Sequence, residues 1–447
     1  MSNNSNLAII ILAAGKGTRM KSCLPKVMHK IAGRPMLGWL IESCEALNPE
    51  KLIVVTAPDM QDVIDTVSPH QAVFQTEQKG TGDAVKPALE HLKNFKGRVL
   101  ILLGDEPFID LDVVRDMIAY DNIAAMAVTL DDPTGLGRMI ADKDGFLQSI
   151  VEEKDCTDEQ RQIKICNSGN YCIPADKLED WIHKITNDNA QGEYYLTDLP
   201  QIATNDGVKT KIFNVDAAVG WGINNRVQLA AHEKYAQEIL RERAMLSGVT
   251  MMDPDSVTLS WDTEFGQDVV LEPNVYIGPW TSIEDNATIH ASSYIEGAII
   301  EAGAQVGPFA RIRPKSVVGE GASVGNFIEI NRSVIKAGAK AKHAAYLGDA
   351  EIGEGANIGA GTIIANYDGF FKHKTTIGQK VFVGSNSTII SPVSVGDGAI
   401  IAAGSNVNKD INENAMAIGR SRQENHLGWA TQYRYVKKEQ KRHQEED

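Results

Sequence analysis

Residues 12–26 have the sequence Leu-Ala-Ala-Gly-Lys-Gly-Thr-Arg-Met-Lys-Ser-Cys-Leu-Pro-Lys, and they follow an apolar run, residues 7–12, that predicts a buried strand. Two glycines after this strand, Gly15 and Gly17, leave room for backbone that wraps a phosphate group. The same turn carries the cationic side chains of Lys16, Arg19 and Lys26. A strand that leads into a glycine-rich, cationic turn predicts a phosphate-binding site.

The spacing of this turn differs from that of the two common phosphate-binding motifs. A P-loop needs Gly, four residues and Gly-Lys-Ser/Thr, and the dinucleotide motif needs a third glycine where this chain has Met20. Pro25 and Lys26 follow Met20 after four residues, which argues against an ordinary strand–helix turn with incidental charge. The pattern resembles the signature of nucleotidyltransferases that join a sugar 1-phosphate to a nucleoside triphosphate.

Length and composition limit the kind of protein. A chain of 447 residues with 43% hydrophobic residues predicts two domains with substantial cores. The net charge of −15 argues against a nucleic-acid partner. Five scattered cysteines without a Cys-x-x-Cys pair indicate reduced thiols in a cytoplasmic protein. No signal peptide and no run of about 18 apolar residues is present, so we expect no membrane association.

The first 222 residues alternate predicted strands with predicted helices. Helical spacing covers residues 36–47, and apolar runs predict strands at 52–56, 99–103 and 124–129. This alternation is typical of a Rossmann-like α/β domain with a largely parallel sheet. Ligands bind such sheets at the carboxyl ends of the strands, so we expect Gly15, Gln75 and Asp105 to meet there.

An amphipathic helix over residues 224–247 is predicted next, within a linker arm at 223–250 that would join two domains. Beyond residue 251 an apolar residue recurs every six positions. The first series is Leu259, Phe265, Leu271, Ile277, Ile283, Ile289 and Ile295, and the last is Ile377, Val383, Ile389, Val395, Ile401 and Val407. Neither helices nor ordinary strands repeat with this period, so residues 251–430 are predicted to form a parallel β-helix. Residues 365–376 should loop out of the coils, and residues 431–447 should form a charged, solvated tail.

A carboxylate at a strand end is the candidate metal ligand. Gly104 and Asp105 follow the strand at 99–103, and such an Asp either caps a helix or holds Mg²⁺ against a triphosphate. The run Gly-Ile-Asn-Asn-Arg at 222–226 matches a second nucleotidyltransferase motif. The resemblance implies that Mg²⁺ binds Asp105 and Asn224.

Further matches extend this resemblance. The segment 75–82, Gln-Thr-Glu-Gln-Lys-Gly-Thr-Gly, resembles the part of the family that reads uracil, and matches near residues 132–138, 152, 167–169 and 192–198 follow in order. The resemblance implies that Lys26 and Arg19 act in catalysis. The implied nucleotide and sugar ligands are Leu12, Ala13, Ala14, Gly15, Lys26, Gln75, Gly80, Thr81, Leu103, Gly104, Asp105, Gly137, Glu152, Asn167 and Asn224.

His343 lies in Lys-His-Ala-Ala-Tyr-Leu-Gly-Asp, which resembles the catalytic run of acetyl-CoA-dependent hexosamine acetyltransferases. In that setting the histidine accepts a proton from the attacking amine. By the same resemblance the sugar phosphate would contact Arg313, Asn331, Tyr346 and Asn357. Acetyl-CoA would contact Ala360, Asn366, Tyr367, Ser385, Ala403 and Arg420.

From residue 7 to residue 429 the chain resembles the bacterial bifunctional N-acetylglucosamine-1-phosphate uridyltransferase / glucosamine-1-phosphate N-acetyltransferase family. The resemblance implies a left-handed β-helix, a homotrimer, and synthesis of UDP-N-acetylglucosamine from UTP, acetyl-CoA and glucosamine 1-phosphate with Mg²⁺, for peptidoglycan and lipopolysaccharide. Two alternatives remain: a nucleotidyltransferase whose β-helix only oligomerises it, and a non-catalytic nucleotide-sensing scaffold. The intact set of Lys26, Asp105 and Asn224 argues against the scaffold.

Two positions depart from the family pattern. Asn331 stands where the family has a lysine that contacts the sugar phosphate, so we expect a weaker pocket there. The adjacent Arg332 should face the opposite way if both residues lie in an extended strand. Glu106 replaces an apolar residue and should add negative charge beside the metal.

Overall fold

The protein is described by a computed structural model that covers residues 6–189 and 191–446. It contains two compact units. The first unit runs to Arg243 and includes Leu259–Trp261, and the second comprises Ala244–Thr258 and the residues from Asp262 onward. The division of the chain at residues 222, 250 and 430 remains a prediction.

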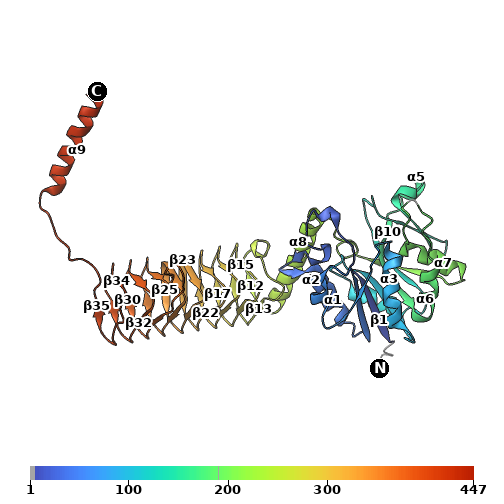
Figure 1. The fold of residues 1–447 in the computed structure, drawn as a ribbon, viewed down its shortest axis with the longest axis horizontal. Helices are drawn as coiled ribbons and strands as arrows, with labels where there is room; N and C mark the ends of the chain where they lie inside the picture. The colour runs from blue at the N-terminus through green and yellow to red at the C-terminus, as the bar shows by residue number, and fades with distance from the viewer. Residues whose placement is uncertain (1–5, 190, 447) are drawn as a thin grey trace. The chain divides into compact units, whose positions relative to one another are not determined.

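The first unit is built on a nine-stranded sheet in the order β5-β4-β1-β6-β10-β7-β11-β9-β8 (Figure 1). Strands β1, β4, β5 and β6 are parallel, and β10 runs antiparallel between β6 and β7. The strands are β1 Leu7–Leu12, β4 Lys51–Thr56, β5 Gln71–Phe74, β6 Arg98–Leu103, β7 Ala124–Thr129, β8 Arg138–Ala141, β9 Phe146–Val151, β10 Ile165–Pro174 and β11 Thr210–Val215. The strands predicted from apolar runs are therefore confirmed. A separate hairpin joins β2 Lys30–Ile31 to β3 Arg34–Pro35.

Helices pack against this sheet and contribute side chains to the core of the unit. The helices of the unit are α1 Met36–Glu45, α2 Gln61–Val67, α3 Thr81–Leu89, α4 Leu111–Ala119, α5 Asp158–Arg161, α6 Ala175–Lys184, α7 Leu199–Asn205 and α8 Arg226–Leu246. Fully buried side chains of β1, β6 and α6, among them Ile10, Ile101 and Trp181, form one core cluster. Helix α8 extends into the second unit. It begins at Arg226 because the side chain of Asn225 accepts hydrogen bonds from the backbone N–H groups of Val227 and Gln228, both at 2.9 Å.

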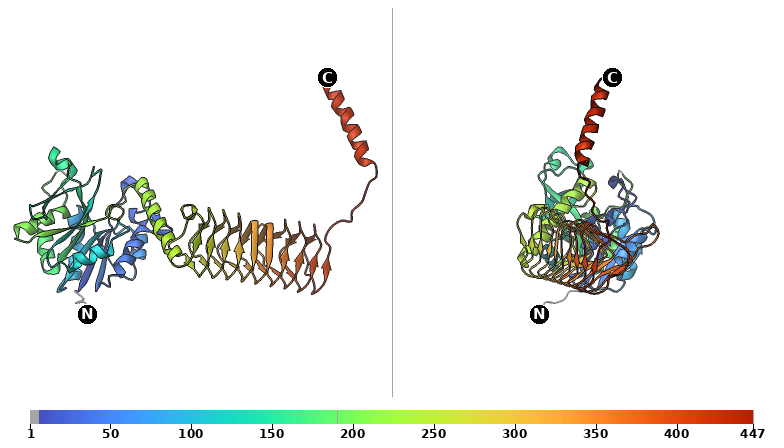
Figure 2. Two further views of the ribbon diagram at one scale, coloured as in Figure 1. Left: turned by 180° about the vertical axis from the view of Figure 1, so that it is seen from behind. Right: turned by 90° about the vertical axis from the view of Figure 1, so that its left-hand side faces the viewer.

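The second unit is a parallel β-helix whose coils stack along one axis (Figure 2). One face consists of β12 Thr250–Met251, β14 Val270–Leu271, β17 Thr288–Ile289, β20 Gln305–Val306, β23 Ser323–Asn331, β25 Lys340–Gly348, β27 Asn357–Ile358, β30 Phe382–Val383, β33 Ile400–Ile401 and β35 Met416–Ala417. A second face adds β15 Tyr276–Ile277, β18 Tyr294–Ile295, β21 Arg311–Ile312, β28 Ile363–Ala365, β31 Thr388–Ile390 and β34 Asn406–Val407. The third face is β13 Glu264–Phe265, β16 Ser282–Ile283, β19 Ala298–Ile300, β22 Ser316–Val318, β24 Val334–Ile335, β26 Ala350–Ile352, β29 Thr375–Ile377 and β32 Val393–Val395.

The register of the coils explains the six-residue period. Ile277, Ile295, Ile312, Ile330 and Leu347 are successive partners and are fully buried. Each coil therefore directs one apolar side chain per face into the solenoid, and the next coil covers it. The longer strands β23 and β25 each belong to two faces.

Two segments lie outside this regular stack. Residues 366–374 leave the coils between β28 and β29 and fold as a hairpin in which Tyr367 pairs with Lys372, as the interrupted repeat predicts. Near the C-terminus, helix α9 spans Trp429–Glu446, and most of its described side chains are exposed. None of the helices in the described ranges is long and apolar enough to cross a membrane.

Candidate nucleotide site and candidate acetyl-transfer site

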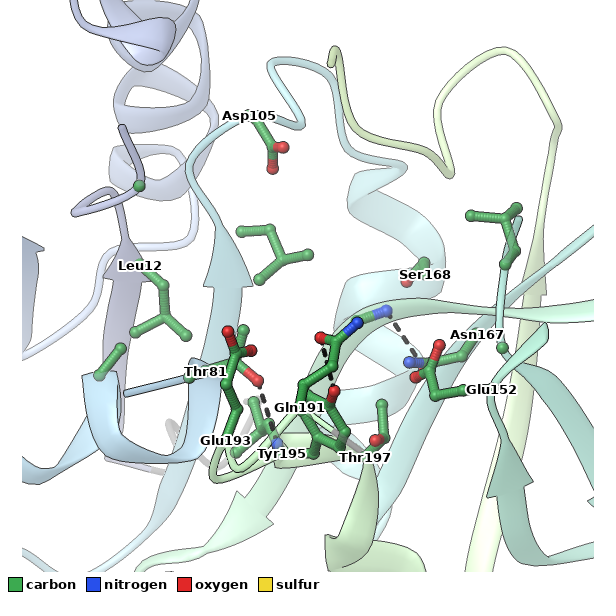
Figure 3. Close-up of a pocket in the computed structure, with 18 of the residues that line it drawn as sticks. Leu12, Thr81, Asp105, Glu152, Asn167, Ser168, Gln191, Glu193, Tyr195 and Thr197 are labelled. Carbon is green, nitrogen blue, oxygen red and sulfur yellow. Dashed lines mark hydrogen bonds between the residues drawn. The ribbon is translucent and has the colours of Figure 1, made fainter. Parts of the chain in front are cut away.

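A cavity of about 860 Å³ opens in the first unit at the carboxyl ends of β1 and β6 (Figure 3). Nearly all residues that the sequence suggests for the nucleotide and sugar line it. They are Leu12, Ala13, Ala14, Gly15, Arg19, Lys26, Gln75, Gly80, Thr81, Leu103, Asp105, Gly137, Glu152 and Asn167. Gly104 lies behind the lining, where its N–H donates to the carbonyl of Leu12 at 2.9 Å. Lys16 is exposed and does not line the cavity. Of the three cationic side chains of the turn, Arg19 and Lys26 therefore line the cavity.

Gly17 allows the turn to close on Lys26. Its φ of 61° is left-handed, and a Cβ atom there would lie 2.5 Å from Cβ of Lys26. The close approach brings the lysine side chain back to the end of β1. An L-residue with a side chain at this position would push Lys26 away from the cavity.

Two oxygen atoms from distant segments converge on the Lys26 ammonium. It forms an ion pair with the carboxylate of Asp105 and donates to Oδ1 of Asn224 at 3.2 Å. The guanidinium of Arg19 donates to the same Asn224 oxygen at 2.8 Å. A carboxylate and an amide oxygen that already share one cation suit Mg²⁺, which binds few protein ligands and takes the rest from phosphate and water. Within the described residues no cluster of three His, Cys, Asp or Glu side chains could hold a metal.

Gln75 has one free hydrogen-bonding atom. Its side chain is buried, and its Nε2 donates to the carbonyl of Gly80 and to the carboxylate of Asp83, both at 3.2 Å. The amide oxygen is therefore left to accept a hydrogen bond from a ligand. Beside it, Thr81 accepts the N–H of Leu196 at 3.0 Å, which ties α3 to the opposite wall of the cavity.

The other wall carries an acceptor and a donor. Burial raises the pKa of Glu152, and the nearby carboxylates of Asp155 and Asp198 add to this effect. The oxygen of Asn167 accepts the N–H of Gly169 and the hydroxyl of Tyr171, both at 3.1 Å, so its amide nitrogen is available as a donor. A hydroxylated ligand such as a sugar would find both groups here.

Glu106 is directed away from the converging oxygens. Its buried carboxyl accepts a hydrogen bond from Nδ2 of Asn170 at 2.6 Å, and burial raises its pKa well above the ordinary value. The neighbouring charge of Asp105 contributes to this shift. The effect of Glu106 on the metal remains a prediction.

Several lining residues have no role assigned from the sequence. The loop before α7 contributes Gln191, Glu193, Tyr195 and Thr197, and β10 contributes Ser168 (Figure 3). The motifs at 167–169 and 192–198 include all of these residues except Gln191 and could have identified them as lining residues. The spacing of these motifs gave no indication of which side chains face the cavity.

In the second unit, His343 has a fixed partner. Residues 326 and 343 are neighbours in the pairing of β23 with β25, and Nδ1 of His343 lies 3.0 Å from Oδ1 of Asn326. An amide oxygen only accepts, so Nδ1 carries the proton and Nε2 keeps its lone pair. The arrangement makes Nε2 a suitable proton acceptor.

The residues proposed for the sugar phosphate lie on the same strands as His343 or on adjoining coils. Tyr346 is paired with Glu329, and Arg313 donates to the carboxylate of Glu329 at 2.9 Å. Asn357 pairs with Lys340 on the next coil. Asn331, by contrast, is 4% exposed and accepts a hydrogen bond from Nη1 of Arg332 at 3.1 Å. The expectation that Arg332 points away from Asn331 is therefore wrong.

Most of the residues proposed for acetyl-CoA follow one corner of the coils. The carbonyls of Ala360 and Ser385 accept the N–H groups of Asn386 and Gly404, respectively. Gly384 packs so closely on Ala403 that its missing Cβ atom leaves the needed space. Arg420 lies beside Gly404 on the following coil, and Tyr367 lies in the looped-out hairpin. An elongated ligand would run along such a column.

Comparison with known proteins places the whole chain in one family. It is 46% identical over 438 residues to "Bifunctional protein GlmU" of Sphingopyxis alaskensis, covering 96% of this chain and 97% of that protein. The proteins of the same name from Paramagnetospirillum magneticum and Zymomonas mobilis are 44% and 42% identical, over 96% and 98% of this chain and 97% and 100% of theirs. The chain belongs to the GlmU family.

Domain-level matches divide the GlmU sequence as the two units suggest. A model of the MobA-like NTP transferase domain matches residues 9–152, within the first unit. The bacterial transferase hexapeptide model, six repeats, matches residues 374–409, and a model of the GMPPB C-terminal domain matches residues 294–391. Members of the GlmU family are uridylyltransferases and acetyltransferases, and this chain is such a bifunctional enzyme.

Proposed function

We propose that the cavity of the first unit carries uridylyl transfer and that the coils around His343 carry acetyl transfer. Together the two reactions make UDP-N-acetylglucosamine from glucosamine 1-phosphate, acetyl-CoA and UTP, as expected of a GlmU enzyme. The observation that carries the assignment is the convergence on the Lys26 ammonium of Asp105, which lines the cavity with Lys26, and of Asn224, which does not line it.

In uridylyl transfer the phosphate of N-acetylglucosamine 1-phosphate attacks the α-phosphorus of UTP, and pyrophosphate leaves. The sugar phosphate oxygen gains the bond that the bridging oxygen of pyrophosphate loses. Lys26 and Arg19 would bind the phosphate oxygens and offset the charge that builds up on them. Mg²⁺, held by Asp105 and Asn224, would supply further charge neutralisation when bound.

In acetyl transfer the amine of glucosamine 1-phosphate attacks the thioester carbonyl of acetyl-CoA. The new amide bond replaces the carbon–sulfur bond, and coenzyme A leaves as a thiol. His343 would accept a proton from the amine at Nε2, because Asn326 holds the other ring nitrogen as a donor. Asn331, Arg313 and Tyr346 would hold the sugar phosphate.

The test uses two mixtures: free thiol is measured with glucosamine 1-phosphate and acetyl-CoA, and pyrophosphate is measured with N-acetylglucosamine 1-phosphate, UTP and Mg²⁺. Asp105→Asn keeps the shape but removes a charge, so pyrophosphate release should fall by orders of magnitude while thiol release continues. Normal pyrophosphate release by this variant at limiting Mg²⁺ would refute the metal assignment. A wild-type chain that releases pyrophosphate but no thiol would favour the alternative, a β-helix that only oligomerises the enzyme.

We also propose that the enzyme is a cytoplasmic homotrimer assembled through the β-helix. The flat faces of the coils and the exposed aromatic side chains on them, such as the stacked rings of Phe309 and Phe327, support this proposal. Light scattering on the full chain would test the assembly.

A further inference from the structure

Arg332 and Asp349 occupy the same corner on two successive coils. Both have left-handed backbone, with φ angles of 52° and 49°, and the N–H of Asp349 donates to the carbonyl of Asn331 at 2.9 Å. A turn at residue 332 ends the alternation of strand β23, so the guanidinium can return toward Asn331. Such backbone is costly for an arginine, which points to a side chain that is held for a purpose.

The two side chains form a bidentate ion pair. Nε and Nη2 of Arg332 donate to the two carboxylate oxygens of Asp349, each at 2.7 Å. The hydrogen bonds from Arg332 hold the pKa of Asp349 below its usual value, so the carboxylate stays ionised at neutral pH. At that pH Arg332 can only donate hydrogen bonds and Asp349 can only accept them.

Each member of the pair also binds one amide side chain. Nη1 of Arg332 donates to Oδ1 of Asn331 at 3.1 Å, and Nδ2 of Asn366 donates to the carboxylate of Asp349. A guanidinium cannot accept a hydrogen bond and a carboxylate cannot donate one. Neither amide can therefore exchange the positions of its oxygen and nitrogen atoms without losing its hydrogen bond. Both amides are nearly buried, at 4% and 5% exposure, so few other orientations are open to them.

The pair also lies beside another residue proposed for the sugar phosphate. Gly348 precedes Asp349, and a Cβ atom there would lie 2.6 Å from the hydroxyl of Tyr346 and 2.7 Å from Nδ2 of Asn366. The phenol and the amide therefore approach the same small space above Gly348. The ion pair thus connects residues proposed for two different substrates.

We propose that Arg332 and Asp349 are a positioning pair that holds Asn331 as a hydrogen-bond donor and Asn366 as an acceptor in the acetyl-transfer site. This inference rests on the proposed function of the β-helix. The free N–H₂ group of Asn331 suits an oxygen of the sugar phosphate. The free oxygen of Asn366 suits an amide N–H, such as those along the arm of acetyl-CoA. No partner for either atom is found among the described residues.

The pair accounts for the neutral residue at 331. A lysine there would place a second cation against Arg332 and would offer it no acceptor. Asn331 and Arg332 are therefore matched to each other, and the amide can bind the phosphate without a charge of its own. The weaker pocket expected from the sequence remains a prediction, because an oriented amide still lacks the charge of a lysine.

Steady-state acetyl transfer by the full-length chain tests the inference. Thiol release is measured while the concentration of each substrate is varied. The two variants are Arg332→Lys, which keeps the positive charge but cannot form the bidentate contact with Asp349, and Asp349→Asn. A lost or misdirected hydrogen bond weakens binding by about 2- to 10-fold, so KM should rise by about that much for both substrates. The value of kcat should change far less, and pyrophosphate release from UTP should be unaffected.

Glu351→Gln is the matched control. The carboxylate of Glu351 forms ion pairs with Lys336 at 2.6 Å and with Lys374 at 2.8 Å in the same part of the solenoid. It does not orient the amide of Asn331 or of Asn366. Its loss should leave both KM values unchanged. The inference is wrong if Asp349→Asn keeps both wild-type KM values, or if the control raises them equally. A wild-type chain without thiol release would instead overturn the proposed function, and this inference with it.

Discussion

Single side-chain amides in the nucleotide cavity have orientations that their partners dictate. Gln75 gives both of its N–H groups to protein acceptors, and Asn167 gives its oxygen to two protein donors. One therefore faces a ligand as an acceptor and the other as a donor. The residue types were predictable from the sequence, but these orientations were not, because they depend on Asp83, Gly169 and Tyr171.

Gln75→Ala should reduce the preference for UTP over CTP. Uracil carries an N–H at N3 that can donate to the free oxygen of Gln75, whereas cytosine has an unprotonated acceptor there. Loss of one such contact is worth about 1 kcal/mol, so the ratio of kcat/KM values should fall roughly fivefold. Pyrophosphate release with each nucleotide measures the ratio, and an unchanged ratio would move base recognition to another residue.

Glu152 predicts a pH dependence for uridylyl transfer. Its raised pKa means that protonation begins at a higher pH than for an exposed glutamate, and protonation removes the charge that makes it a strong hydrogen-bond acceptor for the sugar. KM for N-acetylglucosamine 1-phosphate should therefore rise as the pH falls toward that pKa.

Glu152→Gln should have a KM that is less sensitive to pH, which separates this effect from titration of the phosphate itself. A raised carboxyl pKa also means that the ionised form destabilises the fold above that pKa. The variant should therefore be at least as stable at neutral pH. A KM profile identical to that of the wild type would exclude Glu152 from the site.

Gly80→Ala should disrupt the wall of the cavity. Gly80 has a φ of 112°, and a Cβ atom there would collide with the carbonyl oxygen of Tyr194 and lie 2.8 Å from its N–H nitrogen. Combined strain and collision should lower the free energy of unfolding by roughly 2–4 kcal/mol, measured by denaturant titration. Gly145→Ala is the control, since Gly145 has a φ of 85° with nothing near its Cβ position. Equal losses for both variants would show that backbone strain alone accounts for the effect.

At the scale of elements, the six-residue period predicted the β-helix because one buried residue per face is the only pattern that stacks its coils. The apolar runs likewise predicted β1, β4, β6 and β7. The corners at Arg332 and Asp349, whose left-handed backbone interrupts strand alternation, could not be predicted from the residue pattern. An Asn or Gly at such a corner would have been recognisable, but an arginine is not.

The hairpin at residues 366–374 should be dispensable for folding and required for acetyl transfer. It lies outside the coils, and Thr375, the first residue after it, pairs with Ala350 of the preceding coil, so the stack resumes directly behind the hairpin. Replacing the hairpin with a short Gly-Ser turn should therefore leave the melting temperature of the β-helix within a few degrees. Thiol release should be lost, because Asn366 and Tyr367 are removed.

A matched variant that changes only the exposed tip, Phe370→Ser with Phe371→Ser, controls for altered solubility. Retention of acetyl transfer by the chain without the hairpin would exclude its two polar residues from the acetyl-CoA site. A large drop in melting temperature would show instead that the hairpin supports the coils.

At the scale of the whole molecule, the two units should work independently. Each has its own core, and each proposed site lies within one unit. General-base catalysis is typically worth about 10²–10⁴-fold, so His343→Ala should slow thiol release by that factor and leave pyrophosphate release intact. Full thiol release by this variant would assign the base to another group. The family resemblance gave this organisation directly, although the units' relative placement could not be inferred from it.

The pairing of the coils sets what insertions the second unit could accept. Leu271 pairs with Ile289, and Ile289 pairs with Val306, so these coils close after 18 and 17 residues and each pairs with the coils on either side of it. An extra segment of 18 residues placed before residue 300 would lengthen the solenoid by one full layer and leave the order of its faces intact. An extra segment of six would rotate every later residue by one face relative to the coils before the insertion, while Asn326 and His343, which both follow it, would stay paired. Natural length variation in such a solenoid should therefore occur in whole coils.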